Sequence, residues 1–392
     1  MTPVLSGTWN YPTKVWHGPG QITGLAKACE FAGMKRPLLV TDSGLRENGV
    51  IIRVTQLLEL GGIPVALFSD VKGNPTGANV DAGIAAYRAG NCDGVIAVGG
   101  GSALDVGKSI AFMVGQNRPI WDFEDIDDWW TRADPAGVAP VIAVPTTAGT
   151  GSEVGRGAVV TNEATHEKKI IFHPLMLPKL AISDPELTVG LPPKLTAWTG
   201  MDALAHCIEA YCAPGFNPMA DGIAVEGIRL IADHLPTAVR DGNDLEARSR
   251  MLAAASMGAA AFQKGLGAVH SISHPVGAVY DTHHGLTNGV VLPYVLTFNR
   301  PAIEERMAYV AAALGLPGGD FDALIEWLLV FRSSLFVPHS LGELGVQEAR
   351  AGELAEKALR DPSTGGNPVP MTVEDFRRVI VSAITGDLTL GA

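Results

Sequence analysis

The chain has 392 residues and a formal net charge of −12 at neutral pH. Its lysines and arginines are few and scattered, which argues against nucleic acid or an anionic membrane surface as a partner. A hydrophobic content of 47% predicts a large buried core. No stretch approaches the roughly 20 apolar residues that a membrane span needs, and the length suits two domains.

The N-terminal stretch, residues 1–12, has no basic segment followed by an apolar one, so we expect no signal peptide. The cysteines follow no metal-binding spacing. We interpret them as reduced, buried thiols of a cytoplasmic protein. They are Cys29, Cys92, Cys207 and Cys212.

The first half of the chain alternates short apolar runs with longer stretches that begin at turn residues. The short runs are typical of buried strands and the longer stretches of helices. This alternation predicts an α/β fold, in which helices cover both faces of a parallel sheet. The predicted strands are residues 36–42, 63–68, 93–98 and 138–144, and the predicted helices are residues 48–60, 78–89 and 103–114.

A glycine-rich turn, Gly99–Ser102, follows the third predicted strand directly and opens a helix. Glycines let the backbone approach an anion closely, and a helix N-terminus offers free N–H groups to phosphate. Such a turn is also common as a plain tight connection. Three threonines after the next strand, at the same edge of the sheet where ligands bind in open α/β folds, favour a nucleotide site: Thr146, Thr147 and Thr150.

Asp42 ends the first strong strand. An acid there accepts hydrogen bonds from ribose hydroxyls and repels a 2′-phosphate, which favours NAD over NADP. An ordinary turn aspartate is the alternative. The stretch Gly18–Gly24 also resembles a dinucleotide-binding loop, but no good strand signal precedes it, so we reject it.

The pattern changes around the double proline at residues 192–193. Strand signals almost vanish after it, and long alanine-rich helical stretches follow. We predict a dinucleotide-binding α/β domain at residues 1–187 and an all-helical metal- and substrate-binding domain at residues 188–392. The helical stretches are residues 218–234, 245–264 and 303–313.

Asp202 and His206 lie four residues apart among good helix formers. At this spacing both side chains leave one helix face, so a carboxylate and an imidazole can share one divalent cation. Such a pair alone is usually solvated or locally hydrogen-bonded. A glycine-rich apolar segment downstream carries His270, His274 and His284, and the two segments together favour a metal site.

Several separate motifs, in one order, resemble those of the iron-containing (group III) alcohol dehydrogenases over nearly the whole chain. The resemblance implies an α/β domain followed by an all-helical domain, the architecture that dehydroquinate synthase shares. It also implies a catalytic divalent metal, usually Fe²⁺ and sometimes Zn²⁺. The motifs are Gly99–Lys108, Pro145–Glu153, Gly200–His206, and Gly267–Pro275 continuing to His284-Gly285.

Residue by residue, the resemblance implies that Asp202, His206, His270 and His284 bind the metal. His274 matches a further histidine near the nicotinamide and substrate. His283 adjoins His284 and remains a rival ligand, and Lys169 is a similar rival of Lys168. The residues expected at the dinucleotide are Asp42, Asn74, Gly99, Gly100, Gly101, Ser102, Thr146, Thr147, Thr150, Lys168 and Leu187.

The implied reaction is hydride transfer between a primary alcohol, or its aldehyde, and NAD(H). The metal acts as a Lewis acid that stabilises the alkoxide, and His274 relays the hydroxyl proton to solvent. One carboxylate and three imidazoles suit Fe²⁺ and Zn²⁺ equally, so the preference for iron comes from the resemblance. A small alcohol or aldehyde is the expected partner, and a homodimer is the expected assembly.

A dehydroquinate-synthase-like lyase, or another non-redox metalloenzyme on the same fold, is the alternative. Such a lyase needs clustered basic residues for a phosphorylated acidic substrate, whereas Lys264 and Arg300 are the only ones in residues 251–300. The segment Gly155-Arg156-Gly157 differs from the bulkier residues common after the Gly-Ser-Glu motif. The sequence therefore does not name the alcohol.

Overall fold

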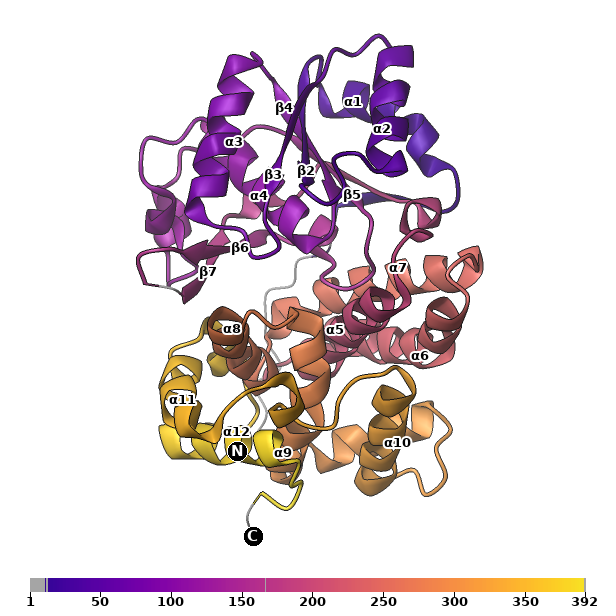
Figure 1. Ribbon diagram of the computed structural model, residues 1–392, viewed down its shortest axis with the longest axis vertical. Coiled ribbons are helices and arrows are strands. Elements are labelled where there is room, and N and C mark those ends of the chain that lie inside the picture. Colours follow the sequence, from indigo (N-terminus) through magenta and orange to yellow (C-terminus); the bar gives the residue numbers. More distant parts are fainter. Residues whose placement is uncertain (1–10, 12, 166, 391–392) are drawn as a thin grey trace. The chain divides into compact units, whose positions relative to one another are not determined.

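The computed structural model describes residues 11, 13–165 and 167–390. The stretch 1–12, where no signal peptide is expected, lies outside the described residues apart from Tyr11. The chain forms two compact units, one of residues 11–147 and 151–191, the other of residues 148–150 and 192 onwards (Figure 1). No described helix combines the length and the hydropathy that crossing a bilayer requires.

A six-stranded sheet organises the first unit. Every pairing in it is parallel, and the strand order is β1-β8-β5-β4-β2-β3. The chain therefore runs outward in opposite directions from the neighbouring strands β2 and β4, which is the usual place for a ligand crevice. The strands are β1 (Lys14–His17), β2 (Pro37–Asp42), β3 (Ala66–Val71), β4 (Gly94–Gly99), β5 (Val141–Pro145) and β8 (Leu180–Ser183).

Both faces of this sheet are covered, which the alternation of buried side chains along each strand makes clear. Leu38 and Val40 of β2 pack into one core with α3 (Gly77–Ala89) and α4 (Gly101–Met113). The intervening Leu39 packs into a second core, with α1 (Leu25–Ala32) and α2 (Gly49–Leu60). Figure 1 shows the two helix pairs on opposite sides of the strands. The predicted α/β fold class is confirmed.

Several strand predictions need correction. β3 begins at Ala66 rather than at residue 63, and β5 begins at Val141 rather than at residue 138. In each case a proline, Pro64 or Pro140, lies just before the observed start and has no N–H to donate to the ladder. The antiparallel hairpin of β6 (Gly157–Asn162) and β7 (Glu167–Phe172) was not predicted, nor were β1 and β8.

The prediction that no strand precedes the loop Gly18–Gly24 was wrong. Strand β1 ends at His17, directly before Gly18. The loop instead holds a carboxylate of its own unit. The backbone N–H groups of Gly20 and Ile22 donate to the two carboxylate oxygens of Asp184, at 3.2 and 3.0 Å. An anionic phosphate would compete there with a fixed negative charge.

The second unit contains no strand among its described residues, as the sequence predicts. Its long helix α5 (Pro193–Cys212) is buried along its second half and packs against three other helices. The packing around α5 is tight at Cys207, because a Cβ added to Gly227 would lie only 2.6 Å from the Cys207 Sγ. The other helices are α6 (Pro218–Arg240), α7 (Leu245–Ala261), α8 (Ala268–Tyr280), α9 (His284–Ala313), α10 (Phe321–Ser334), α11 (Ala351–Leu359) and α12 (Val373–Thr385).

Helix α9 continues through Pro293, which cannot donate a backbone hydrogen bond to Gly289. The buried Arg332 replaces the missing donor. Its guanidinium donates to the carbonyls of Gly289 at 3.3 Å and Val290 at 2.7 Å. This contact satisfies carbonyls in the same helix that begins with His284.

All four cysteines are free, and three of them are buried. Burial raises the pKa of the Cys207 and Cys212 thiols to about 12. The predicted reduced, buried thiols are thus confirmed, although Cys92 is only partly buried.

Candidate metal centre and dinucleotide edge

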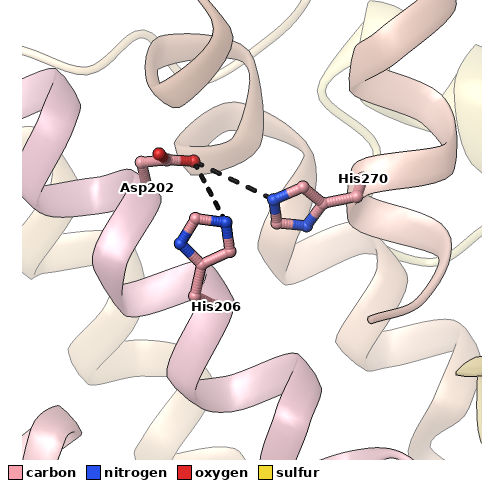
Figure 2. Close-up of side chains that lie close together, drawn as sticks. All are labelled: Asp202, His206 and His270. Carbon is pink, nitrogen blue, oxygen red and sulfur yellow. Dashed lines mark ion pairs between the residues drawn. The ribbon is translucent and has the colours of Figure 1, made fainter. Parts of the chain in front are cut away.

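Helix α5 directs Asp202 and His206 to one face, as their spacing predicts, and α8 brings His270 to the same place (Figure 2). One nitrogen of each imidazole, Nε2, lies 3.9 Å from the Asp202 Oδ1. One ligand atom from each of the three residues lies within 4.8 Å of the other two. All three side chains are buried. Two helices therefore direct three donor atoms to one point.

His284 joins this cluster through Asp202. It begins α9, and its Nε2 lies 3.5 Å from the Asp202 Oδ1. The rival His283 is the N-cap residue of the same helix. Its Nδ1 accepts the Leu286 N–H at 3.4 Å, and its ring contacts Trp198. The geometry brings His284, rather than His283, to the carboxylate.

Glu209, one helical turn beyond His206, determines which nitrogen of His270 is free. Its Oε2 lies 2.5 Å from the His270 Nδ1, and its Oε1 accepts the Val269 N–H at 2.8 Å. Burial alone would lower the pKa of the His270 imidazole. The carboxylates of Glu209, Asp202 and Asp361, with Glu209 first among them, together raise that pKa above its usual value. Because Nδ1 carries the proton toward Glu209, the Nε2 lone pair points into the cluster.

Asn288 marks the centre of the cluster. Its amide nitrogen lies 2.7 Å from the Asp202 Oδ1 and 3.2 Å from the Nε2 atoms of both His270 and His284. Three lone pairs thus converge on one donor nitrogen, as they would on a cation. The amide oxygen of Asn288 is buried and has no hydrogen-bond partner among the described residues. A carboxylate with neutral imidazoles fits a divalent transition metal.

The remaining imidazoles differ in charge environment. Burial lowers the pKa of His206 to about 4, which keeps its ring neutral and able to act as a ligand. His274, on α8, stacks on the His284 ring with centroids 5.3 Å apart. Its Nδ1 lies 2.7 Å from the Asp361 Oδ2. Burial raises the pKa of Asp361, but His274 and the Ser363 backbone N–H outweigh it and hold the pKa below its usual value.

The predicted phosphate turn lies at the carboxyl edge of the sheet in the first unit. Gly99 has φ +149°, and an added Cβ would lie 2.7 Å from the Ala103 Cβ, so the turn needs glycine there. Gly100 and Gly101 lead into α4, whose first residue is Gly101. The Ser102 hydroxyl donates to the Gly73 carbonyl at 2.7 Å. This bond ties the turn to the loop that contains Asn74.

The contacts of Asp42 agree with both interpretations of its role, as a turn aspartate and as a ribose-binding acid. Its Oδ1 accepts the Leu45 N–H at 3.0 Å, as in an ordinary turn aspartate. Its Oδ2 is directed toward the glycine turn, 3.2 Å from where a Cβ on Gly99 would lie. Burial raises the pKa of the Asp42 carboxyl. One oxygen therefore shapes the turn while the other faces the candidate nucleotide site.

Thr146 and Thr147 follow β5 at the same edge. The Thr146 N–H donates to the Gly99 carbonyl at 2.9 Å, and Thr147 lies next to Gly100. Thr150 belongs to the helical unit instead. Leu187 is buried in the 3₁₀ turn after β8.

Lys168 lies on β7, opposite Thr161 of β6. Thr161 in turn donates its N–H to the Pro75 carbonyl at 2.8 Å, beside Asn74. The rival Lys169 is bound elsewhere, since its ammonium pairs with Glu124 and Glu167. Lys168 remains the predicted dinucleotide residue of the two.

Three residues beside the site histidines were not predicted from the sequence: Glu209, Asn288 and Asp361. A signal for Glu209 existed, because it lies three and seven residues beyond His206 and Asp202 and so shares their helix face. Asn288 lies four residues beyond His284 and had the same kind of signal. Asp361 had none, since it reaches His274 across 87 residues of chain.

Comparison with known proteins identifies the family. Residues 12–185 match the description "Iron-containing alcohol dehydrogenase", and residues 196–384 match its C-terminal family. The chain belongs to the iron-containing alcohol dehydrogenase family. The enzyme is thus a metal-dependent, NAD-linked oxidoreductase that acts on alcohols or their aldehydes, and the non-redox alternative is not favoured.

Several relatives cover almost the whole chain. A 4-hydroxybutyrate dehydrogenase of Cupriavidus necator is 43% identical, over 94% of this chain and 98% of the relative. A 1,3-propanediol dehydrogenase of Klebsiella pneumoniae is 39% identical, over 91% and 93%. The crystal structure of a 1,3-propanediol oxidoreductase superposes with a TM-score of 0.91 and 37% identity, over 96% of this chain and all of that one.

Proposed function

We propose that this alcohol dehydrogenase oxidises the terminal hydroxyl of short primary alcohols, and reduces the matching aldehydes, with NAD(H). The convergence of Asp202, His206 and His270 on one buried point carries the proposal. We assign these three residues and His284 as the metal ligands. When bound, the metal supplies Lewis-acid polarisation of the substrate oxygen.

The chain's own residues supply orientation and proton transfer. Glu209 holds His270 with its Nε2 lone pair toward the cluster. His274 lies beside the cluster, stacked on His284, and we assign it the role of accepting the hydroxyl proton and passing it to solvent. The buried setting excludes water from the reacting groups, which strengthens each electrostatic contact.

The dinucleotide site is assigned to the carboxyl edge of the sheet. The glycine turn offers backbone N–H groups at the start of α4 to the pyrophosphate. Asp42 directs one oxygen toward that turn, which suits a ribose 2′-hydroxyl and favours NAD. The other proposed dinucleotide residues are Asn74, Ser102, Thr146, Thr147, Thr150, Lys168 and Leu187.

The names of relatives support a terminal hydroxyl on a short chain. Relatives of similar identity include an NAD-dependent methanol dehydrogenase of Bacillus methanolicus, besides the 4-hydroxybutyrate and 1,3-propanediol enzymes. In the helical unit Lys264 is not available to bind a substrate anion, because its ammonium contacts the Asp221 carboxylate and the Tyr211 carbonyl. Uncharged alcohols and diols are therefore the first substrates to test.

The test is NAD-dependent oxidation of short primary alcohols, diols and ω-hydroxy acids by protein purified without oxygen. Metal-stripped samples receive Fe²⁺ or Zn²⁺, and NADH formation is recorded against an untreated stripped control. We expect activity to return with metal, and the preferred substrate to have a terminal hydroxyl. NADH binding without turnover of any alcohol, with either metal, would contradict the proposal.

We further propose that the enzyme is a cytoplasmic homodimer. Four free cysteines, three of them buried, suit a reducing compartment. The dimer rests on the family resemblance, and light scattering after gel filtration tests it: a monomeric mass near 41.0 kDa would contradict it.

A further inference from the structure

A short segment near the end of the chain, Asp361–Asn367, lies along the N-terminal half of α8. We call it the η11 strap, after the 3₁₀ turn Pro362–Gly366 that it contains. The strap makes side-chain hydrogen bonds to α8 at three levels. Asn367 Oδ1 accepts the Ala268 N–H at 3.1 Å, Thr364 Oγ1 donates to Ser271 Oγ at 2.8 Å, and Asp361 Oδ2 lies 2.7 Å from His274 Nδ1.

The three contacted positions on α8 are three residues apart and so lie along one side of the helix. The strap also lies against the backbone just before α8: a Cβ on Gly366 would lie 2.0 Å from the Leu266 carbonyl oxygen. His270 lies on a different side and contacts Glu209. Helix α8 is therefore held between two carboxylates, one behind each of its site histidines.

Asp361 is held in place by hydrogen bonds within the protein. Its Oδ1 accepts the Ser363 N–H at 2.9 Å, so both carboxylate oxygens have defined partners. The carboxylate is 7% exposed. Pro362 follows it directly and favours the extended backbone observed at Asp361, with φ −68° and ψ 137°. Such a carboxylate can orient a partner without first losing conformational freedom.

We propose that Asp361 is a positioning residue for alcohol oxidation, acting through His274. It holds the His274 proton on Nδ1, which leaves the Nε2 lone pair to accept the substrate hydroxyl proton. In each turnover the hydroxyl O–H breaks, the proton passes to Nε2, and the hydride leaves carbon for NAD⁺, giving aldehyde and NADH. The positive imidazole is stabilised by Asp361 until Nε2 releases its proton to solvent.

This inference rests on the proposed role of His274. It can be distinguished by experiment from a purely structural role of the Asp361–His274 pair. A buried aspartate that merely satisfies a buried histidine would stabilise the fold without affecting the chemical step. A positioning aspartate acts on turnover only while His274 is present. Removing it after His274 has already been removed should therefore cost no further activity.

The central variant is Asp361→Asn, which keeps the shape and can donate an N–H to His274, favouring the wrong tautomer. We expect kcat for alcohol oxidation to fall about 10²- to 10⁴-fold. Metal content, the NADH dissociation constant and KM should change little. In a His274→Ala background the same substitution should change kcat less than about twofold.

Thr364→Val is the matched control. It removes the strap's middle hydrogen bond to Ser271 and the hydroxyl contact with the Ala358 carbonyl, but keeps the Asp361 side chain. We expect a lower unfolding midpoint and a kcat within about twofold of the unsubstituted enzyme. A fall in kcat as large as that of Asp361→Asn would show that any disturbance of the strap lowers turnover without a specific role of Asp361, and would overturn the proposal.

The tautomer of His274 can be measured directly, without an activity assay, and in the unsubstituted protein. In metal-free protein labelled with ¹⁵N-histidine, His274 should show its proton on Nδ1, and Asp361→Asn should move it. A neutral His274 ring with its only proton on Nε2 in the unsubstituted protein would overturn the inference. Absence of any alcohol oxidation would instead contradict the proposed function, while the tautomer measurement would still decide whether Asp361 orients His274.

Discussion

The proposed metal cluster and the proposed dinucleotide edge would hold their cofactors in opposite ways. In the cluster, side chains point inward from three helices, and carboxylates behind two histidines set which nitrogen is free. At the edge of the sheet the backbone offers the binding groups. A glycine turn, with φ +149° at Gly99, leads into the N-terminus of α4. Substitutions should therefore affect metal chemistry through side-chain identity at one site, and dinucleotide binding through backbone access and one carboxylate at the other.

The largest expected effect comes from His270→Ala. It removes a proposed ligand and leaves Glu209 buried without its histidine partner. We expect the metal to be lost and kcat to fall about a thousandfold or more. This corresponds to a loss of several kcal/mol of transition-state stabilisation. NADH should still bind, because all of the proposed nucleotide residues except Thr150 lie in the other unit. Metal analysis and NADH fluorescence titration measure the two effects separately, and full turnover by a metal-free variant would disprove the metal mechanism.

Glu209→Gln should have the next largest effect, and it tests whether the carboxylate behind His270 matters for the metal alone. A glutamine still accepts a hydrogen bond from Nδ1 but brings no charge. We expect metal affinity to fall about 10- to 100-fold, with the visible spectrum of the Co²⁺-substituted protein changed.

Glu226→Gln on α6 is the matched control, since that carboxylate pairs with Arg229 at the surface and should leave metal affinity unchanged. Equal metal affinity for Glu209→Gln and the unsubstituted protein would mean that Glu209 serves packing only.

The contrast between the two regions also explains what the sequence could predict. The spacing of Asp202 and His206 was sufficient to place both on one helix face, because helix periodicity is local. The glycine turn was predictable because β4 is uniformly apolar and its turn is adjacent in sequence. Asp361 was not predictable, since its contact with His274 depends on how the strap packs against α8. Strands β6 and β7 were missed because polar residues such as Lys168 and Lys169 obscure the apolar run.

A smaller effect is expected from Asp42→Ser, which tests the side-chain contribution at the dinucleotide edge. Loss of the carboxylate removes repulsion of a 2′-phosphate, while serine can still cap the turn at Leu45. We expect the ratio of NAD to NADP use to fall about tenfold, equivalent to roughly 1.4 kcal/mol. Ratios of kcat/KM for the two cofactors measure it. An unchanged ratio would leave Asp42 as a turn residue only.

The smallest effects, in stability, should have opposite signs for one carboxylate in each region, Asp361 beside His274 and the partly buried Asp42. The folded-state pKa of Asp361 is depressed, so its contribution to stability is present above the ordinary carboxyl pKa, about 4, and is lost as pH falls through the folded-state pKa. The pKa of Asp42 is raised by burial, so its contribution is present below that ordinary value and is lost as pH rises through the folded-state pKa.

Paired unfolding measurements on metal-free protein between pH 2.5 and 7 test these signs. At pH 7 we expect Asp361→Asn to cost about 2 kcal/mol, since it removes hydrogen bonds to a charged group, and the cost should shrink toward acid pH. Asp42→Asn should be neutral or stabilising at pH 7, because it removes a buried charge, and this benefit should also vanish in acid. If both variants were destabilised alike at pH 7, the two carboxylates would not differ in the way that the two regions imply. The distinction would then lie in the nitrogen ligands and the glycine turn alone.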